Sequence, residues 1–144
     1  MHYATDSHSL IWYLTEDKKL GKNALSIFTK ADNGEITIIV PTIVLAEIIY
    51  ICEKKKVELE IKRVVDKIKS SLNYLSYNLD IETLEAVISL KGIFEMHDRI
   101  LVATAKLLNA TLITKDEEII TSNVVRTIWW FIVGDDKNDK ENKI

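Results

Sequence analysis

Residues 94–119, FEMHDRILVATAKLLNATLITKDEEI, carry the most informative pattern in the chain. The apolar spacing of His97–Leu108 predicts a buried helix, and Thr111–Thr114 predicts a buried strand directly after it. Asp98 stands at the start of the helix, and Asp116 follows the end of the strand. Two acids beside aliphatic runs that must be buried indicate carboxylates brought to one place in the fold.

The rest of the chain alternates short β-like runs with helical patterns. Such alternation predicts an α/β protein, a three-layer α/β/α sandwich with a five-stranded parallel sheet. The predicted strands are Tyr3–Thr5, Thr37–Val40, Leu75–Leu79, Thr111–Thr114 and a last strand from Thr127 through the run WWFIV. The predicted helices start at Ser7 and cover Lys22–Ala31, Thr42–Lys55, Glu60–Leu72, Ile81–Leu90 and His97–Leu108. We expect a single domain over residues 1–133 and a polar, disordered tail over residues 134–144.

The bulk composition limits the function. The 144 residues carry a net charge of −3, so the basic surface that grips nucleic acid by charge alone is absent. Cys52 is the only cysteine, which excludes a disulfide framework and a thiolate metal cluster. The sequence has no signal-peptide pattern and no apolar run approaching about 18 residues, so we expect no membrane contact and a cytoplasmic protein.

Four acids fall where an α/β sheet collects functional groups, beyond the carboxyl ends of its strands. Asp6 follows the first strand, Asp116 follows the fourth, and Asp98 opens the helix before the fourth. Glu47 lies within the helix after the second strand and is the only charged residue between Glu35 and Glu53. That helix is apolar almost all round, so we expect it to be buried on most faces.

Each acid has an ordinary structural explanation when taken singly. Asp6 and Asp98 suit helix N-termini, Asp116 suits the cap of the turn EEII, and Glu47 would pair with a buried Arg or Lys. Together they need more, because two carboxylates about 5 Å apart repel by roughly 3 kcal/mol at an effective dielectric constant near 20. Such a cluster must share protons or bind cations, and oxygen ligands favour Mg²⁺ or Mn²⁺. Metal-dependent hydrolysis of phosphodiesters follows from that chemistry.

Four segments resemble a known family. They are TDSHSLIWYL (5–14), PTIVLAEII (41–49), HDRILVATAKLLNATLITKDEEI (97–119) and TIW (127–129). In order and spacing they resemble the PIN domain, and within it the VapC-like ribonuclease toxins of toxin–antitoxin pairs. The resemblance covers Tyr3 to Trp129, nearly the whole chain.

The resemblance implies a fold, a site and partners. It implies that Asp6, Glu47, Asp98 and Asp116 bind Mg²⁺ or Mn²⁺ and carry the catalysis, and that the Thr114 hydroxyl supports them. Ser7 stands where this family commonly has Thr. The resemblance also implies RNA as substrate, a homodimer, and a small antitoxin protein that covers the site. Because PIN domains also serve in RNA processing and DNA repair, a DNA-directed or processing nuclease and a catalytically silent binding module remain alternatives.

Other residues have competing interpretations. Arg99, a supporting candidate, could touch a substrate phosphate, but an arginine beside an acid more often holds it in place. Trp12 and Tyr13 could stack on a base, although their helical spacing favours core or dimer packing. Glu95, His8 and His97 are interpreted as outer or surface groups, and the lysines around residues 54–69 as a solvated helix face.

Two other function classes also gather acids beside a parallel sheet. A phosphoacceptor signalling domain needs adjacent acids after the first strand, where this chain has Asp6 alone. A haloacid-dehalogenase-like phosphatase needs a second acid two residues after Asp6, where His8 stands. The sequence disfavours both.

Overall fold

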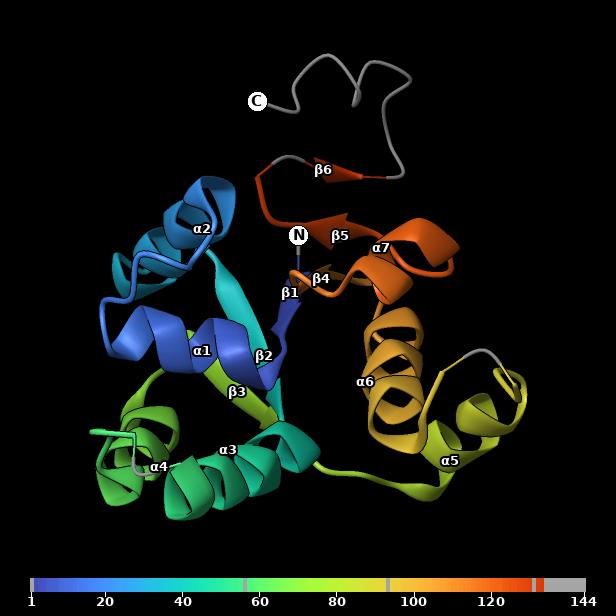
Figure 1. Ribbon diagram of the computed structural model, residues 1–144, viewed down its shortest axis with the longest axis horizontal. Helices are drawn as coiled ribbons and strands as arrows, with labels where there is room; N and C mark the ends of the chain where they lie inside the picture. The colour runs from blue at the N-terminus through green and yellow to red at the C-terminus, as the bar shows by residue number, and fades with distance from the viewer. Residues whose placement is uncertain (1, 56, 93, 131, 134–144) are drawn as a thin grey trace.

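The computed structural model describes residues 2–55, 57–92, 94–130 and 132–133, and Figure 1 shows their arrangement. The strands are β1 (His2–Thr5), β2 (Thr37–Pro41), β3 (Tyr74–Tyr77), β4 (Ala110–Ile113), β5 (Thr127–Ile128) and β6 (Ile132–Val133). The helices are α1 (Ser7–Leu14), α2 (Lys22–Asp32), α3 (Thr42–Lys55), α4 (Ile61–Ser70), α5 (Ile81–Ile88), α6 (Met96–Leu107) and α7 (Glu117–Ser122). The predicted helices and the first four predicted strands are present, with ends that differ by a few residues.

The strands form one sheet in the order β3-β2-β1-β4-β5-β6. The first five of these run parallel, as predicted. From β1 the chain moves outward to β2 and β3, then returns to place β4 on the other side of β1. The boundary between β1 and β4 is therefore the topological switch point, where ligands of open α/β sheets bind beyond the carboxyl ends of the strands.

The end of the sheet differs from the prediction. The run after Thr127 was expected to continue one strand, but β5 ends at Ile128 and β6 pairs with it in the antiparallel direction. A sixth strand therefore follows the five parallel ones. The predicted tail at residues 134–144 lies outside the described residues.

Helices cover both faces of the sheet, which gives the predicted three layers. Figure 1 shows α1 to α4 on one side of the strands and α5 to α7 on the other. This division follows from the topology, because right-handed crossovers from β1 outward and from β3 back to β4 place their helices on opposite faces. The central strands are fully buried between the layers, with Ala4, Val40 and Leu112 among the side chains at 0% exposure. Continuous aliphatic runs in β2 and β4 suit strands that are covered on both faces.

The environment of α3 corrects a second prediction. Its Val44, Ile48 and Ile51 are buried, as an apolar helix requires. On another face, however, Ile49 is 39% exposed and Tyr50 is 61% exposed. The helix is therefore half-covered rather than buried on most faces, and its apolar outer side remains open in this chain.

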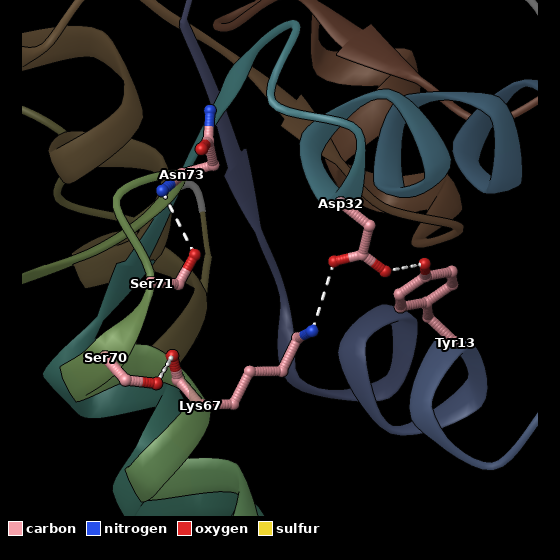
Figure 2. Close-up of polar contacts among 6 residues, drawn as sticks. All are labelled: Tyr13, Asp32, Lys67, Ser70, Ser71 and Asn73. Carbon is pink, nitrogen blue, oxygen red and sulfur yellow. Dashed lines mark hydrogen bonds and ion pairs between the residues drawn. The ribbon is translucent and has the colours of Figure 1, made fainter.

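A polar cluster at the amino edge of the sheet joins three helices (Figure 2). Asp32, the last residue of α2, accepts a hydrogen bond from the Tyr13 hydroxyl and another from Lys67 Nζ at 3.1 Å. The Lys67 ammonium also lies 4.9 Å from the centroid of the Tyr74 ring. Burial acts to raise the pKa of Asp32, but the bonds from Tyr13 and Lys67 outweigh it and lower that pKa. We call Tyr13, Asp32 and Lys67 the Asp32 cluster.

None of the helices in the described part of the chain has both the length and the apolar character needed to cross a membrane.

Candidate active site

A pocket of about 420 Å³ opens at the switch point, beyond the carboxyl ends of β1 and β4. All four predicted acids line this pocket, together with Thr114. We call it the acidic pocket. Its remaining lining residues are Ser7, His8, Ser9, Trp12, Ile43, Val44, His97, Leu101, Lys115, Glu117 and Ile119.

Asp6 is held by the turn from β1 into α1. Its main-chain N–H donates to the carbonyl of Ile113 at 3.2 Å, which ties the end of β1 to the end of β4. Its Oδ1 accepts from the main-chain N–H of Ser9 at 2.9 Å and so caps α1. Burial raises the pKa of Asp6, although the Ser9 and Thr114 hydroxyls and the Ser9 amide act to lower it. The cap therefore fixes a carboxylate that the pocket desolvates.

Asp116 is held in the same way at the turn from β4 into α7. Its Oδ1 accepts from the main-chain N–H of Ile119 at 3.0 Å, so it is the N-cap of α7. Its own N–H donates to the hydroxyl oxygen of Thr114 at 3.1 Å. The buried Thr114 thus links Asp116 to Asp6, since its hydroxyl also interacts with the Asp6 carboxylate. For both acids the capping and pocket-lining roles apply together.

Glu47 reaches the pocket from α3, and its partner comes from α1. The Ser7 hydroxyl donates to Glu47 Oε1 across 40 positions of sequence. The buried Ser7 thereby orients the one charged side chain in the first turns of α3. The alternative explanation for Glu47, pairing with a buried Arg or Lys, is not seen among the described residues.

Asp98 lies in the first turn of α6, where its side chain is partly buried. Burial raises its pKa, and the negative charges of Asp116, Glu95, Glu47 and Glu118 raise it further, to about 6. Neighbouring negative charges raise a carboxyl pKa because they disfavour its ionised form. Near neutral pH the pocket therefore holds repelling carboxylates, which a bound cation would stabilise.

This arrangement agrees with the comparison with known families, in which the chain matches the PIN domain over residues 3–122. The chain belongs to the PIN domain family. PIN domains are generally nucleases and typically use divalent metal ions. The predicted resemblance and the α/β fold are thus confirmed for most of the chain.

Solved structures agree with that membership. One is the VapBC2 complex from Rickettsia felis bound to a DNA fragment from its promoter, with a TM-score of 0.67 and 20% identity over 90% of this chain and 99% of that chain. Another is a toxin–antitoxin complex from Klebsiella pneumoniae, with a TM-score of 0.58 and 18% identity over 79% of this chain and 86% of that chain. At these identities the likeness concerns the fold. A comparison with curated protein sequences gave no match.

The acids of this PIN domain fit a divalent ion by their chemistry, because carboxylate oxygens are the ligands that Mg²⁺ and Mn²⁺ prefer. Within residues 2–55, 57–92, 94–130 and 132–133, no three His, Cys, Asp or Glu side chains are already gathered to hold a metal. Ion binding therefore requires the side chains to move together within the pocket. The hydrogen bonds to the Oδ1 atoms of Asp6 and Asp116 restrict the movement of these two carboxylates.

Arg99 takes a different place from its neighbour Asp98. Its Nη2 donates to the carbonyl of Val87 at 2.8 Å, near the end of α5, and Arg99 is not among the residues that line the acidic pocket. This contact ties α6 to α5 and favours a structural role over contact with a phosphate. His97 Nδ1 and Glu95 Oε1 lie 3.6 Å apart and both side chains are exposed, consistent with their interpretation as outer or surface groups.

Sequence patterns missed several pocket residues. Ser7 appeared only as a family difference, yet it holds Glu47. Trp12 was assigned to packing and Lys115 received no role, although both line the pocket. The signal for Lys115 was its place between Thr114 and Asp116, where any side chain must lie at the rim of the site.

Proposed function

We propose that this PIN domain is a divalent-metal-dependent endoribonuclease and the toxin of a VapBC-type toxin–antitoxin pair. The single observation that carries the proposal is the acidic pocket at the switch point. There Asp6, Glu47, Asp98 and Asp116 converge, and burial together with neighbouring negative charges, those of Asp116 and Glu47 included, raises the pKa of Asp98 to about 6. Without a bound cation the repulsion between these charges would only destabilise the fold, so the arrangement favours a cation site.

The roles of the chain's own groups follow from their contacts. Asp6, Glu47, Asp98 and Asp116 would hold Mg²⁺ or Mn²⁺, with Thr114 and Ser7 fixing the positions of three of these carboxylates. When bound, the ion supplies charge neutralisation for a phosphate and lowers the pKa of an attacking water. The main-chain N–H groups that grip Asp6 and Asp116 keep those carboxylates in place before substrate arrives, which limits reorganisation during the reaction.

The proposed partners are an antitoxin protein and a second copy of the chain. The similar folds described as VapBC2 and as a toxin–antitoxin complex support an antitoxin partner. The exposed apolar side chains of α3 and α5 suit contact with other chains, since Ile81 and Ile88 of α5 are each 70% exposed. We propose a cytoplasmic location, where RNA substrates for such an activity are present.

The deciding experiment measures cleavage by the purified protein of single-stranded, hairpin and transfer RNAs and of matched DNAs. It is run with Mg²⁺, with Mn²⁺ and with a chelator. We expect RNA cleavage that needs the metal and disappears in Asp98→Asn. The matched control is Asp66→Asn, an exposed acid of α4 that pairs with Lys62 and should leave the rate unchanged.

Other results would change the proposal. Cleavage confined to DNA would keep the site and replace ribonuclease with the DNA-directed alternative. Metal binding without cleavage of any substrate would favour the binding-module alternative and contradict the proposed function.

A further inference from the structure

Trp12 projects from α1 to the border of the acidic pocket. It is partly exposed and lines both the acidic pocket and a neighbouring depression formed with Ile51 and Glu58. One edge of its ring meets the buried Trp129 in a T-shaped contact with centroids 5.9 Å apart. Trp129 is itself fixed, because its ring packs where a Cβ on Gly21 would lie and its carbonyl accepts from the Ala24 N–H. The position of Trp12 is therefore set by a rigid neighbour.

Within the described ranges, Lys115 is the only Lys or Arg among the residues that line the acidic pocket. It is exposed and follows Thr114 directly, one residue before Asp116. Despite the acids around it, Lys115 makes no ion pair in the described part of the chain. Its ammonium instead lies 5.7 Å from the centroid of the Trp12 ring.

Lys19 brings a second cation to the same ring. Its ammonium lies 5.8 Å from the Trp12 centroid and 4.0 Å from Asp17 Oδ2, and its side chain is 65% exposed. The His8 ring also approaches Trp12, with centroids 5.6 Å apart. In a chain of net charge −3, the two lysines bring positive charge beside the pocket that needs to admit a phosphate.

The Trp12 ring can be covered by a lysine or by a stacked base, and the relative strengths of these two contacts decide which one prevails. A lysine over an exposed aromatic ring gains about 2- to 5-fold in binding, whereas a stacked base gains about 5- to 150-fold. A base that arrives can therefore replace a lysine on the ring. The displaced ammonium, on a flexible side chain, is then free to bind the phosphate of the same nucleotide.

We propose that Trp12, Lys115 and Lys19 form a nucleotide subsite that holds one unpaired base and its phosphate beside the acidic pocket. The subsite rests on the proposed function for its role, since it would place the neighbouring phosphodiester among the four acids. It selects substrates with an unpaired nucleotide next to the cleaved bond, because a base within a duplex cannot reach the Trp12 face.

The test measures binding of a fluorescent single-stranded oligoribonucleotide and of a duplex of the same composition, by anisotropy in chelator at low salt. Lys115→Gln should weaken single-strand binding about 5- to 10-fold and reduce the slope of log K against log salt by about 0.7. Lys106→Gln is the matched control, because Lys106 is exposed on α6 and lines a separate depression with His2 and Asn109. It should change binding less than about 2-fold.

Stacking is tested by tryptophan fluorescence. The single strand should quench the emission of the unaltered protein, and Trp12→Phe should remove most of that quenching while retaining most of the affinity, because phenylalanine also stacks. Trp12→Leu should weaken binding about 10-fold. Thermal melts of both variants show whether the contact with Trp129 has been lost instead.

The inference is overturned if Lys115→Gln and Lys106→Gln behave alike, if the duplex binds as tightly as the single strand, or if quenching survives Trp12→Phe. Any of these results would favour a protein partner, rather than a nucleotide, as the ligand of this surface. Binding in chelator needs no catalysis, so failure of the proposed nuclease activity can be recognised separately. If the nuclease activity is found, Lys115→Gln should raise KM about 5- to 10-fold with kcat nearly unchanged.

Discussion

The acidic pocket and the Asp32 cluster use carboxylates in opposite ways. In the Asp32 cluster one carboxylate accepts hydrogen bonds from a tyrosine hydroxyl and a lysine ammonium. These bonds lower the pKa of Asp32 against the opposing effect of partial burial. In the acidic pocket, burial and four neighbouring acids raise the pKa of Asp98 to about 6. The first arrangement stabilises this fold as it stands. The second is stabilised only when something positive is added.

This difference shows how to separate structural from functional acids in one chain. Asp32 and Asp98 are both partly covered carboxylates at helix ends, so position alone does not distinguish them. The hydrogen-bond donors around each carboxylate distinguish the two, because a carboxylate already paired with donors is stable without a bound cation.

The largest difference should appear in activity. Glu47→Gln and Asp116→Asn should each lower the rate of metal-dependent cleavage by about 100-fold or more, since losing part of an ion site removes about 3 kcal/mol of transition-state stabilisation. Asp32→Asn should change the rate less than about 2-fold, because the Asp32 cluster lies at the opposite edge of the sheet. Initial rates at saturating metal measure both. Equal losses from the two regions would contradict the division.

A smaller loss of activity should follow removal of the Ser7 hydroxyl. Ser7→Ala leaves Glu47 without its donor and should lower the cleavage rate about 10-fold, as loss of a group that orients a metal ligand commonly does. Ser7→Thr should restore most of the rate, because threonine keeps the hydroxyl. Ser26→Ala, at an exposed position of α2, serves as the control. An unchanged rate in Ser7→Ala would mean that Glu47 is oriented by other contacts.

Metal should stabilise the protein, and this effect should depend on pH. At about 100 times its Kd, Mg²⁺ or Mn²⁺ should raise the free energy of unfolding by about 2.7 kcal/mol at pH 7.5. The gain should be smaller at pH 5, where the Asp98 carboxyl, with its pKa raised to about 6, is largely protonated and protons compete with the ion. Thermal melts with metal and with chelator at both pH values test this. A gain that is equal at the two pH values would place the ion away from Asp98.

The smallest effects concern the stability of the metal-free protein, and their signs should be opposite. The pKa of Asp98 is raised on folding, so its favourable contribution is complete below about 4 and is lost as pH rises through about 6. The pKa of Asp32 is lowered, so its contribution is present above the ordinary value of 3.8 and is lost as pH falls through the folded pKa. At pH 7.5, Asp98→Asn should therefore stabilise the metal-free protein by on the order of 1 kcal/mol, after allowance for solvent screening.

At the same pH, Asp32→Asn should destabilise the protein by on the order of 1 kcal/mol, because an amide accepts more weakly from Tyr13 and Lys67. Urea unfolding in chelator measures both variants. Two variants that shift stability in the same direction would show that the acidic pocket is not under electrostatic strain.

The stretch at residues 94–119 allowed part of the fold and part of the acidic pocket to be predicted. The helix and strand in it are α6 and β4, and Asp98 and Asp116 do line one pocket. The prediction succeeded because hydrophobic periodicity depends on local chemistry, and because parallel strands deliver their carboxyl ends to one edge. The prediction for the run after Thr127 was wrong, since a short apolar segment can continue a strand or reverse and pair with it.

The sequence by itself determined the order of strands and helices, the acids that follow them, and membership of the PIN domain family over residues 3–122. These depend on the spacing of apolar and acidic residues along the chain. Only the tertiary structure decided that Ser7 holds Glu47, that Arg99 reaches α5, and that Lys115 lies over Trp12. These contacts join α1 to α3, α6 to α5, and the turn between β4 and α7 to α1. No local pattern specifies the directions of these side chains, because they follow from how separate elements pack against one another.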